Sequence, residues 1–426
     1  VLLFSYVGYS KYEHQVLKSE SNLRIQLKPD EKVLETVTVI GQMSQSKVSL
    51  AGSISTIDAK ELQVPATSIN NMLGGRIAGI VSFQNSGEPG KNISQFWVRG
   101  IGTFGASSGA LVLIDGLEGS LAQIDPADVQ SFSVLKDASA TAVYGNRGAN
   151  GVVLVTTKRG QSGKLTITAR GNFTVSQLKR MPEYLRAADY ATLANEASIQ
   201  SGNPILYNDR AMKLITNGLD RDIYPDVNWQ KEILKPVSYQ QTYFLNATGG
   251  GSIARYYIST GYSNESAAYK QDPNSKFKNG VGYQRFTYRS NIDMNLTKST
   301  TLYLGLDGYI ENRTSPGFTN TDQLWYLTRT LTPLMFATRY STGQFPTSGI
   351  ENTYSPYTML NETGFSSQSD NRNMVTLALS QDLGMITKGL KARFQVASEY
   401  KTWLTEGRRV VPDMYTAMGR SSTGEL

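Results

Sequence analysis

Cysteine is absent from this sequence of 426 residues, and histidine occurs once, as His14. Without cysteine there is no disulfide framework, no thiol nucleophile and no cysteine metal site. One histidine excludes a histidine metal cluster, and His14 stands between Glu13 and Gln15, where we interpret it as a solvated strand residue. The carboxylates are dispersed without a nucleophile and base beside each other. We therefore expect a protein that is not an enzyme and has no catalytic residue, metal site or cofactor.

Long apolar runs are missing as well. No run of 18 apolar residues occurs, which excludes a membrane-spanning helix. The strands of a membrane β-barrel alternate in polarity and escape such a scan, so that class of membrane protein remains possible. The formal charge of +7 comes from 42 basic and 35 acidic residues that are scattered along the chain. Because no basic stripe with interleaved aromatics appears, we expect no nucleic-acid partner.

The sequence begins VLLFSYVGYS, without an initiator methionine or a signal peptide, and ends in polar residues. We interpret it as a fragment of a longer protein. Its length allows two or three domains, and an apolar content of 39% is enough for a core.

The stretch 134–159, VLKDASATAVYGNRGANGVVLVTTKR, is the centre around which the rest is organised. It predicts a strand at 131–135, a short helix at 138–144 capped by Asp137, and a β-branched strand at 152–157. The glycine loop between helix and strand consists of Gly145, Gly148 and Gly151, which permit positive φ. Gly145 and Gly148 also have the spacing of a phosphate loop, but the Lys-Ser/Thr pair that should follow is missing.

Upstream of this stretch the pattern predicts further short elements of an α+β domain. A helix starts near Pro65 and Thr67, with one apolar face formed by Ile69, Met72, Leu73 and Ile77. Strands are predicted at 80–83, 95–99 and 110–114. Asp115-Gly116 predicts a tight turn, and Asp125-Pro126 a capped helical turn.

From Lys164 onward the polarity alternates with period two, which predicts antiparallel strands. Seven candidate strands lie at 164–176, 239–248, 255–263, 285–296, 302–311, 374–383 and 390–401. One face is apolar and free of charge, for example at Phe286, Tyr288, Ile292, Met294 and Leu296. The other carries the charges, among them Arg285, Arg289, Asp293, Asp307, Glu311, Arg393 and Glu399. An apolar exterior over a polar lumen is the pattern of a membrane barrel.

The connections alternate between short turns and the long stretches 177–238, 264–284 and 312–373, as at the two ends of an outer-membrane barrel. The first long stretch predicts a helix at 183–197 with Leu185, Tyr190 and Leu193 as packing residues. The long stretches also contain the aromatic residues Trp229, Trp325, Tyr326, Tyr340, Tyr354 and Tyr357. These rings can stack on sugars, but they equally form interfacial girdles or stiffen loops.

The run LKDASATAVYGNRGANGVVLVTTKRG closely resembles the end of the plug domain in TonB-dependent outer-membrane transporters of the SusC and RagA branch of Bacteroidetes. Trp97-Val98-Arg99-Gly100 and Leu113-Ile114-Asp115-Gly116 extend the resemblance. It implies the following plug motif residues: Arg99, Gly100, Asp115, Gly116, Lys136, Asp137, Tyr144, Gly145, Arg147, Gly148 and Gly151. In such a plug we expect Arg99, Arg147 or Lys136 to be buried against carboxylates or the barrel wall, where paired charges hold the plug and let it move.

By the same resemblance the segment Glu35, Thr36, Val37, Thr38, Val39 looks like the TonB box, the handle pulled by TonB with ExbB and ExbD. An extended Thr/Val segment can add to a sheet edge. An ordinary strand is the alternative.

The resemblance implies four regions. Residues 1–29 are similar to the C-terminal part of a carboxypeptidase-regulatory-like β-sandwich, 30–50 are a linker with the TonB box, 51–162 are the plug, and 163–426 are the first strands of an incomplete barrel. The expected fold class is thus an α+β plug followed by part of a large antiparallel transmembrane β-barrel, with a sandwich remnant at the N-terminus.

The implied function is TonB-dependent import of a nutrient, preferably an oligosaccharide, across the outer membrane of a Gram-negative bacterium. The implied partners are TonB, a SusD-like surface lipoprotein and outer-membrane lipid. Import of peptides, a siderophore or cobalamin is the alternative. Two other classes are a surface-signalling receptor, which needs an N-terminal signalling domain, and a soluble β-rich enzyme, which needs a converging polar site.

Overall fold

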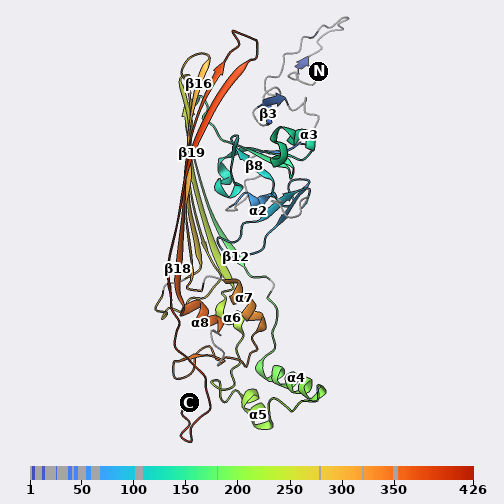
Figure 1. The fold of residues 1–426 in the computed structure, drawn as a ribbon, viewed down its shortest axis with the longest axis vertical. Helices are drawn as coiled ribbons and strands as arrows, with labels where there is room; N and C mark the ends of the chain where they lie inside the picture. Colours follow the sequence, from blue (N-terminus) through green and yellow to red (C-terminus); the bar gives the residue numbers. More distant parts are fainter. Residues whose placement is uncertain are drawn as a thin grey trace. The chain divides into compact units, whose positions relative to one another are not determined.

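The computed structural model describes residues 68–100, 109–179, 181–277, 280–318, 321–348 and 354–426, residue 25, and short strands nearer the N-terminus. It divides into two compact units. The first comprises Val1–Asn85 and Ile93–Lys158, and the second comprises Ser86–Asn92 and Arg159–Leu426. Each unit is described by itself (Figure 1).

The first unit is built on a five-stranded sheet in the order β5-β10-β11-β8-β9. Its strands are β5 (Ile54–Asp58), β8 (Leu111–Ile114), β9 (Leu117–Glu118), β10 (Val129–Leu135) and β11 (Val152–Thr157). β10 pairs antiparallel with β5 and β11, and β11 pairs parallel with β8. Both strands predicted around the central stretch are confirmed, because their β-branched and apolar residues form the middle of this sheet.

Smaller elements complete this unit. They are the hairpin β6 (Ile80–Phe83) and β7 (Gln95–Val98), helices α2 (Asn70–Leu73) and α3 (Ala138–Thr141), and the 3-10 helices η2 (Leu121–Gln123), η3 (Pro126–Asp128) and η4 (Ala142–Gly148). Nearer the N-terminus lie the hairpins β1 (Leu2–Phe4) with β2 (Tyr12–His14) and β3 (Val37–Ile40) with β4 (Met43–Ser46). Most of the region 1–29, which the resemblance assigns to a sandwich remnant, lies outside the described residues.

The core of this unit gathers apolar side chains from α2, β6, β7, β10 and β11, with Ile69, Leu73 and Phe132 completely buried. The predicted apolar face is confirmed, but its helix is shorter than expected, four residues ending before Gly74, and Pro65 and Thr67 lie outside the described residues. Asp125 accepts a hydrogen bond from the Ala127 amide at 2.8 Å, as the predicted cap requires.

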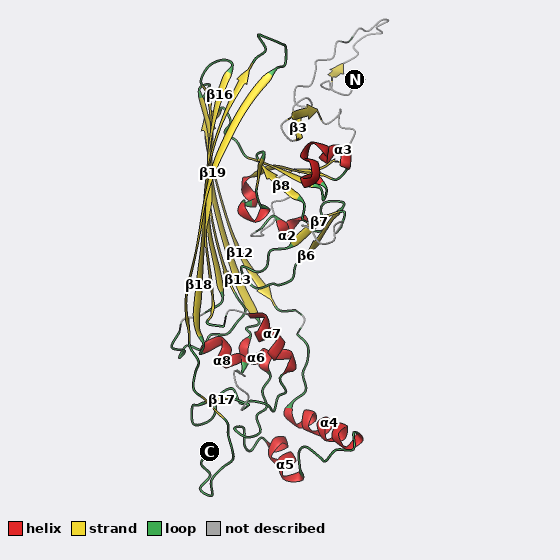
Figure 2. Cartoon of the chain, in the orientation of Figure 1, coloured by secondary structure: helices red, strands yellow, loops and turns green. Residues whose placement is uncertain are grey.

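The second unit contains a seven-stranded antiparallel sheet in the order β12-β13-β14-β15-β16-β18-β19 (Figures 1 and 2). The strands are β12 (Gly163–Gln177), β13 (Val237–Gly250), β14 (Ala254–Ser266), β15 (Gly282–Asn295), β16 (Thr300–Pro316), β18 (Gly364–Asp382) and β19 (Lys391–Arg409). All seven predicted strands are present. β18 begins ten residues earlier than predicted, because it pairs with β16 from Phe365 onward, where polar residues on both faces hide the alternation.

The register confirms which residues share a face. Ile292 pairs with Leu304 and Phe286 with Ile310 on one side, whereas Arg289 pairs with Asp307 and Arg285 with Glu311 on the other. Large apolar side chains of the first face, including Leu245, Ile258, Leu377 and Val396, are exposed. Charges occur on this face at the end of β19, at Glu406 and Arg408. An exposed face that is apolar along most of its strands suits hydrocarbon rather than water.

The long connections lie at one end of the sheet and carry most of its helices (Figure 1). They contain α4 (Ala187–Gln200), α5 (Asp209–Asn217), α6 (Trp229–Ile233), α7 (Thr321–Thr330), α8 (Pro356–Asn361) and β17 (Phe345–Pro346). β17 pairs parallel with β20 (Met414–Tyr415), which follows β19. Only the first of these helices was predicted. None of the described helices is long and apolar enough to cross a membrane.

The predicted helix at 183–197 is shifted, because Asp226 accepts from the Ala187 amide at 2.9 Å and fixes the start of α4 there. The expected packing residues Leu185 and Leu193 are wrong, since both are exposed. Ala187 and Ala191 are buried instead, in a cluster with Ile215 of α5.

Candidate functional site

The loops that connect the strands of the first unit hold its motif charges. Arg99 forms an ion pair with Asp137, and the Lys136 ammonium donates to the Ala78 carbonyl. Asp137 occupies the predicted N-cap position of α3, but its side chain makes no cap hydrogen bond. Its carboxylate instead ties the connection after β10 to the end of β7.

Arg147 of η4 forms an ion pair with Glu118 of β9. Within the described residues the side chains of Arg99 and Arg147 are 56% and 64% exposed and paired with carboxylates, and their burial against the barrel wall stays a prediction. Exposed ion pairs contribute at most about 1 kcal/mol each. These pairs are therefore weak enough to open when a modest force acts on the unit.

Asp115 has a different, more firmly held position. Its φ is +49°, as the predicted turn with Gly116 requires, and its carboxylate accepts from the Thr157 amide at 3.0 Å and the Thr157 hydroxyl at 2.6 Å. Thr157 is completely buried at the end of β11. Asp115 thus joins the β8–β9 turn to the last residue of the central strand.

The glycine loop is shaped by two kinds of constraint. Gly145 and Gly151 have the predicted positive φ, and a Cβ on Gly151 would meet Val98 at 2.9 Å. Gly148 has no positive φ, but a Cβ there would lie 2.8 Å from the Thr141 carbonyl oxygen. Tyr144 packs against a small cluster that contains Leu135 and Val152. Gly100 also has positive φ, +93°.

The proposed TonB box falls only partly within the described residues. Val37, Thr38 and Val39 belong to β3, which pairs with β4, whereas Glu35 and Thr36 lie outside the described residues. The assignment as a TonB-binding segment stays a prediction.

The charged face of the sheet in the second unit holds an ion-pair network. Asp307 lies 2.7 Å from Arg372 and 3.7 Å from Arg289. Arg372 also pairs with Glu399, which in turn lies 3.2 Å from Lys401. Charges of opposite sign on four adjacent strands are thus matched, which is how a polar surface with buried charges is stabilised.

The segment Ser86–Asn92 lies between β6 and β7 in the sequence but groups with the second unit. Glu88 accepts from the Thr321 hydroxyl at 2.8 Å and from the Tyr269 hydroxyl at 3.2 Å. Asn92 donates to Glu265 at 2.8 Å. Burial and the neighbouring Glu88 carboxylate raise the pKa of Tyr269. The segment is therefore held by two different long connections of the sheet.

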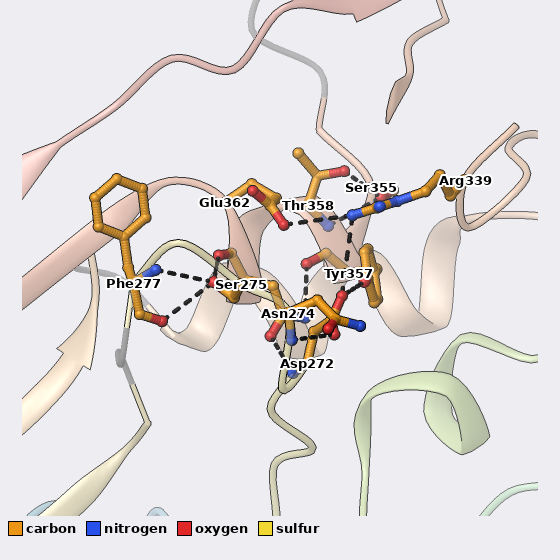
Figure 3. Close-up of polar contacts among 10 residues, drawn as sticks. Asp272, Asn274, Ser275, Phe277, Arg339, Ser355, Tyr357, Thr358 and Glu362 are labelled. Carbon is orange, nitrogen blue, oxygen red and sulfur yellow. Dashed lines mark hydrogen bonds and ion pairs between the residues drawn. The ribbon is translucent and has the colours of Figure 1, made fainter. Parts of the chain in front are cut away.

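A second polar cluster joins the long connections to each other. Arg339 lies 3.6 Å from Glu362 and 3.9 Å from Asp272, and the Tyr357 hydroxyl donates to Asp272 (Figure 3). Burial raises the pKa of Glu362, and the hydrogen bond from Tyr357 lowers the pKa of Asp272. The cluster fastens the β14–β15 connection to α8 and to the segment before β17.

Most of the aromatic residues noted in the long connections form part of this packing. Trp229, Tyr340 and Tyr354 are almost completely buried, and Trp229 packs edge-on against Phe336. Tyr326 is 57% exposed. We therefore interpret the buried rings as residues that stiffen the loops. The ring of Tyr326 remains accessible for contact with a ligand.

Sequence reasoning missed Glu88, Tyr269, Thr321, Arg339 and Glu362. Each stands in a polar stretch without periodicity, and their partners are up to 233 residues away. Such contacts have no local signal in one sequence.

Three comparisons with known proteins bear on this arrangement. The family model described as "TonB-dependent Receptor Plug Domain" matches residues 46–152. "TonB-dependent receptor P3" of Formosa agariphila is 34% identical over 314 residues, which are 72% of this chain and 28% of that protein. "TonB-dependent receptor SusC" of Bacteroides thetaiotaomicron is 29% identical over 309 residues, 70% of this chain and 29% of that protein.

Among solved structures, the RagAB peptide importer in the "open-open" state matches with a TM-score of 0.73 at 22% identity. The match covers 90% of this chain and 44% of that chain. The chain thus spans less than a third of the length of the two receptors and under half of the solved chain.

Proposed function

This chain belongs to the TonB-dependent receptors of the SusC and RagA branch, and from this premise we propose that the whole protein imports a nutrient across the outer membrane. The predicted fold class, an α+β plug followed by part of a large antiparallel barrel, is confirmed. The proposed nutrient is an oligosaccharide, captured together with a SusD-like surface lipoprotein. TonB, with ExbB and ExbD, would supply the energy.

The observation that carries the proposal is the two-faced sheet. Its exposed face is apolar along most of the strands, with the charges Glu406 and Arg408 at the end of β19, and its opposite face holds the network around Asp307 and Arg372. This division is what a strand needs when one side meets lipid and the other lines a polar path.

The mechanism requires movement rather than covalent chemistry. Arg99–Asp137 and Arg147–Glu118 are exposed ion pairs, so they can open when the N-terminal segment is pulled. The buried contact between Asp115 and Thr157 would keep the central sheet intact meanwhile. The plug would then shift as a folded body and let the nutrient pass.

Peptide import is the second candidate, because the RagAB protein that shares this fold is named a peptide importer. A pull-down of the full-length protein from gently solubilised outer membranes, followed by mass spectrometry, tests both candidates. A co-purifying lipoprotein with a bound oligosaccharide supports the proposal, and a bound peptide supports the second candidate. Recovery of the protein in the soluble fraction would overturn both.

A further inference from the structure

Arg285 differs from Arg313 and Arg372, two other arginines on the charged face of the sheet. Arg313 donates through Nε to Glu311 at 2.9 Å, and Arg372 donates to Asp307 at 2.7 Å. Arg285 is 5% exposed, yet its Nε and Nη2 are buried without a hydrogen-bond partner in the part of the chain that the structure describes.

Glu311 is the residue directly opposite Arg285 in the strand pairing. It does not serve as the missing acceptor, because it receives hydrogen bonds from Arg313 and, at 2.7 Å, from the Tyr283 hydroxyl. The contact that Arg285 does make is with an aromatic ring: its Cζ lies 4.9 Å from the centroid of Tyr309. A ring face attracts a cation, but it offsets only part of the cost of burying one.

The two atoms without a partner form one side of the planar guanidinium, and the same side binds carboxylates elsewhere in this protein. Arg420 uses Nε and Nη2, both at 2.8 Å, on the two oxygens of Asp220. Arg186 uses the same two atoms on Asp226. This side presents two parallel donors whose spacing fits a carboxylate.

We propose that Arg285, with Tyr309 behind it, is a binding site for a carboxylate carried by the imported nutrient. The inference rests on the proposed import function, since that function makes the charged face the surface along which the nutrient passes. The carboxylate would come from a uronic acid of an acidic oligosaccharide or from an acidic peptide. In either case the carboxylate of the nutrient accepts the hydrogen bonds of Arg285 for which the described residues provide no acceptor.

Access to Arg285 depends on the segment Ser86–Asn92. Gly90 of this segment lies against Tyr283 and Arg313, the next pair along the same face. Glu88 anchors the segment through Thr321 and Tyr269. Loss of the Glu88 carboxylate should therefore ease the entry of an anion.

The test is isothermal titration of the full-length protein in detergent with four probes: trigalacturonate, galactotriose, triglutamate and triglutamine. It is run on wild type and on Glu88→Ala at constant ionic strength. We expect at least one acidic probe to bind about ten- to a hundredfold more tightly than its neutral counterpart. A preference for trigalacturonate alone identifies an acidic oligosaccharide, and one for triglutamate alone identifies an acidic peptide.

Three variants separate recognition from structure. Arg285→Gln should abolish the acid preference and raise or leave unchanged the thermal midpoint, because it removes a buried charge without an acid. Arg285→Lys should keep part of the preference. Arg393→Gln, on the same face but exposed and bonded to Gln395, should change nothing.

Equal binding of acidic and neutral probes in both wild type and Glu88→Ala, including no binding at all, overturns the proposal. So does an acid preference that survives Arg285→Gln. The titration measures binding without TonB. It therefore tests the carboxylate site even if an import assay shows that the protein does not import the nutrient.

Discussion

Asp115 is the plug-motif residue whose side-chain loss should cost most. Asp115→Ala removes both acceptors of Thr157 and leaves alanine in left-handed backbone, which together should destabilise the central sheet by about 2–4 kcal/mol. Asp115→Asn keeps a turn-forming residue and one acceptor and should cost about 1 kcal/mol. Hydrogen exchange of the β11 amides in the full-length protein measures both changes. Equal losses for the two variants would contradict this role.

Glu362 should make the loop cluster pH-dependent. Its pKa is raised from 4.5, so the folded cluster holds the proton more tightly than the unfolded chain. Its contribution to stability is complete below pH 4.5 and is lost as the pH rises through the higher folded value. Asp272 has the opposite sign: its pKa is lowered from 3.8, so its contribution exists above that pH and is lost as the pH falls through the lower folded value.

At neutral pH Glu362→Gln should therefore leave the amides of α8 as protected from hydrogen exchange as in wild type, or more so. Asp272→Asn, the matched change across Arg339, should lower their protection. A loss of protection in Glu362→Gln at neutral pH would show that its ion pair with Arg339 outweighs the cost of burial.

At the scale of a strand, Val396 and Ala397 provide a matched test of the two faces. They are neighbours on β19, both exposed, but Val396 pairs with Leu377 on the apolar face and Ala397 with Thr376 on the charged face. Arginine facing the middle of the membrane costs about 2–4 kcal/mol. Val396→Arg should therefore reduce assembly in the outer membrane, seen as loss of the heat-modifiable band on gels, whereas Ala397→Arg should assemble normally. Equal assembly would refute the face assignment.

The elements differ in how far one sequence predicts them. The sequence predicts the seven strands β12 to β16, β18 and β19 because, over the predicted ranges, each has one face without charge, which is a local and repeated signal. Helices α5 to α8 were missed because they are short and lie in polar stretches. Leu185 and Leu193 were wrong for a related reason: which side of α4 is buried depends on α5, and a close contact between two helices favours alanine over leucine.

At the scale of the whole molecule, the decisive experiment concerns the proposed TonB box. Deleting Thr36–Val39 from the full-length protein should abolish growth on the nutrient identified by the pull-down, while surface expression and nutrient binding persist. Growth, surface labelling and binding are measured on the same strains. Normal growth after the deletion would contradict the TonB-box assignment. Loss of surface expression would indicate a structural role for β3.

The sequence by itself determined the two-part organisation, the alternating strands and the plug motif, because these depend on local composition and on residues close together in the chain. The tertiary structure decided the partners: Asp137 with Arg99, Asp115 with Thr157, and Glu88 with Thr321. It also decided that Arg285, which looks in sequence like any other charged residue of the face, has two buried donors without an acceptor within the described residues. Burial and pairing are set by strands and loops distant in sequence, so only the folded chain reveals them.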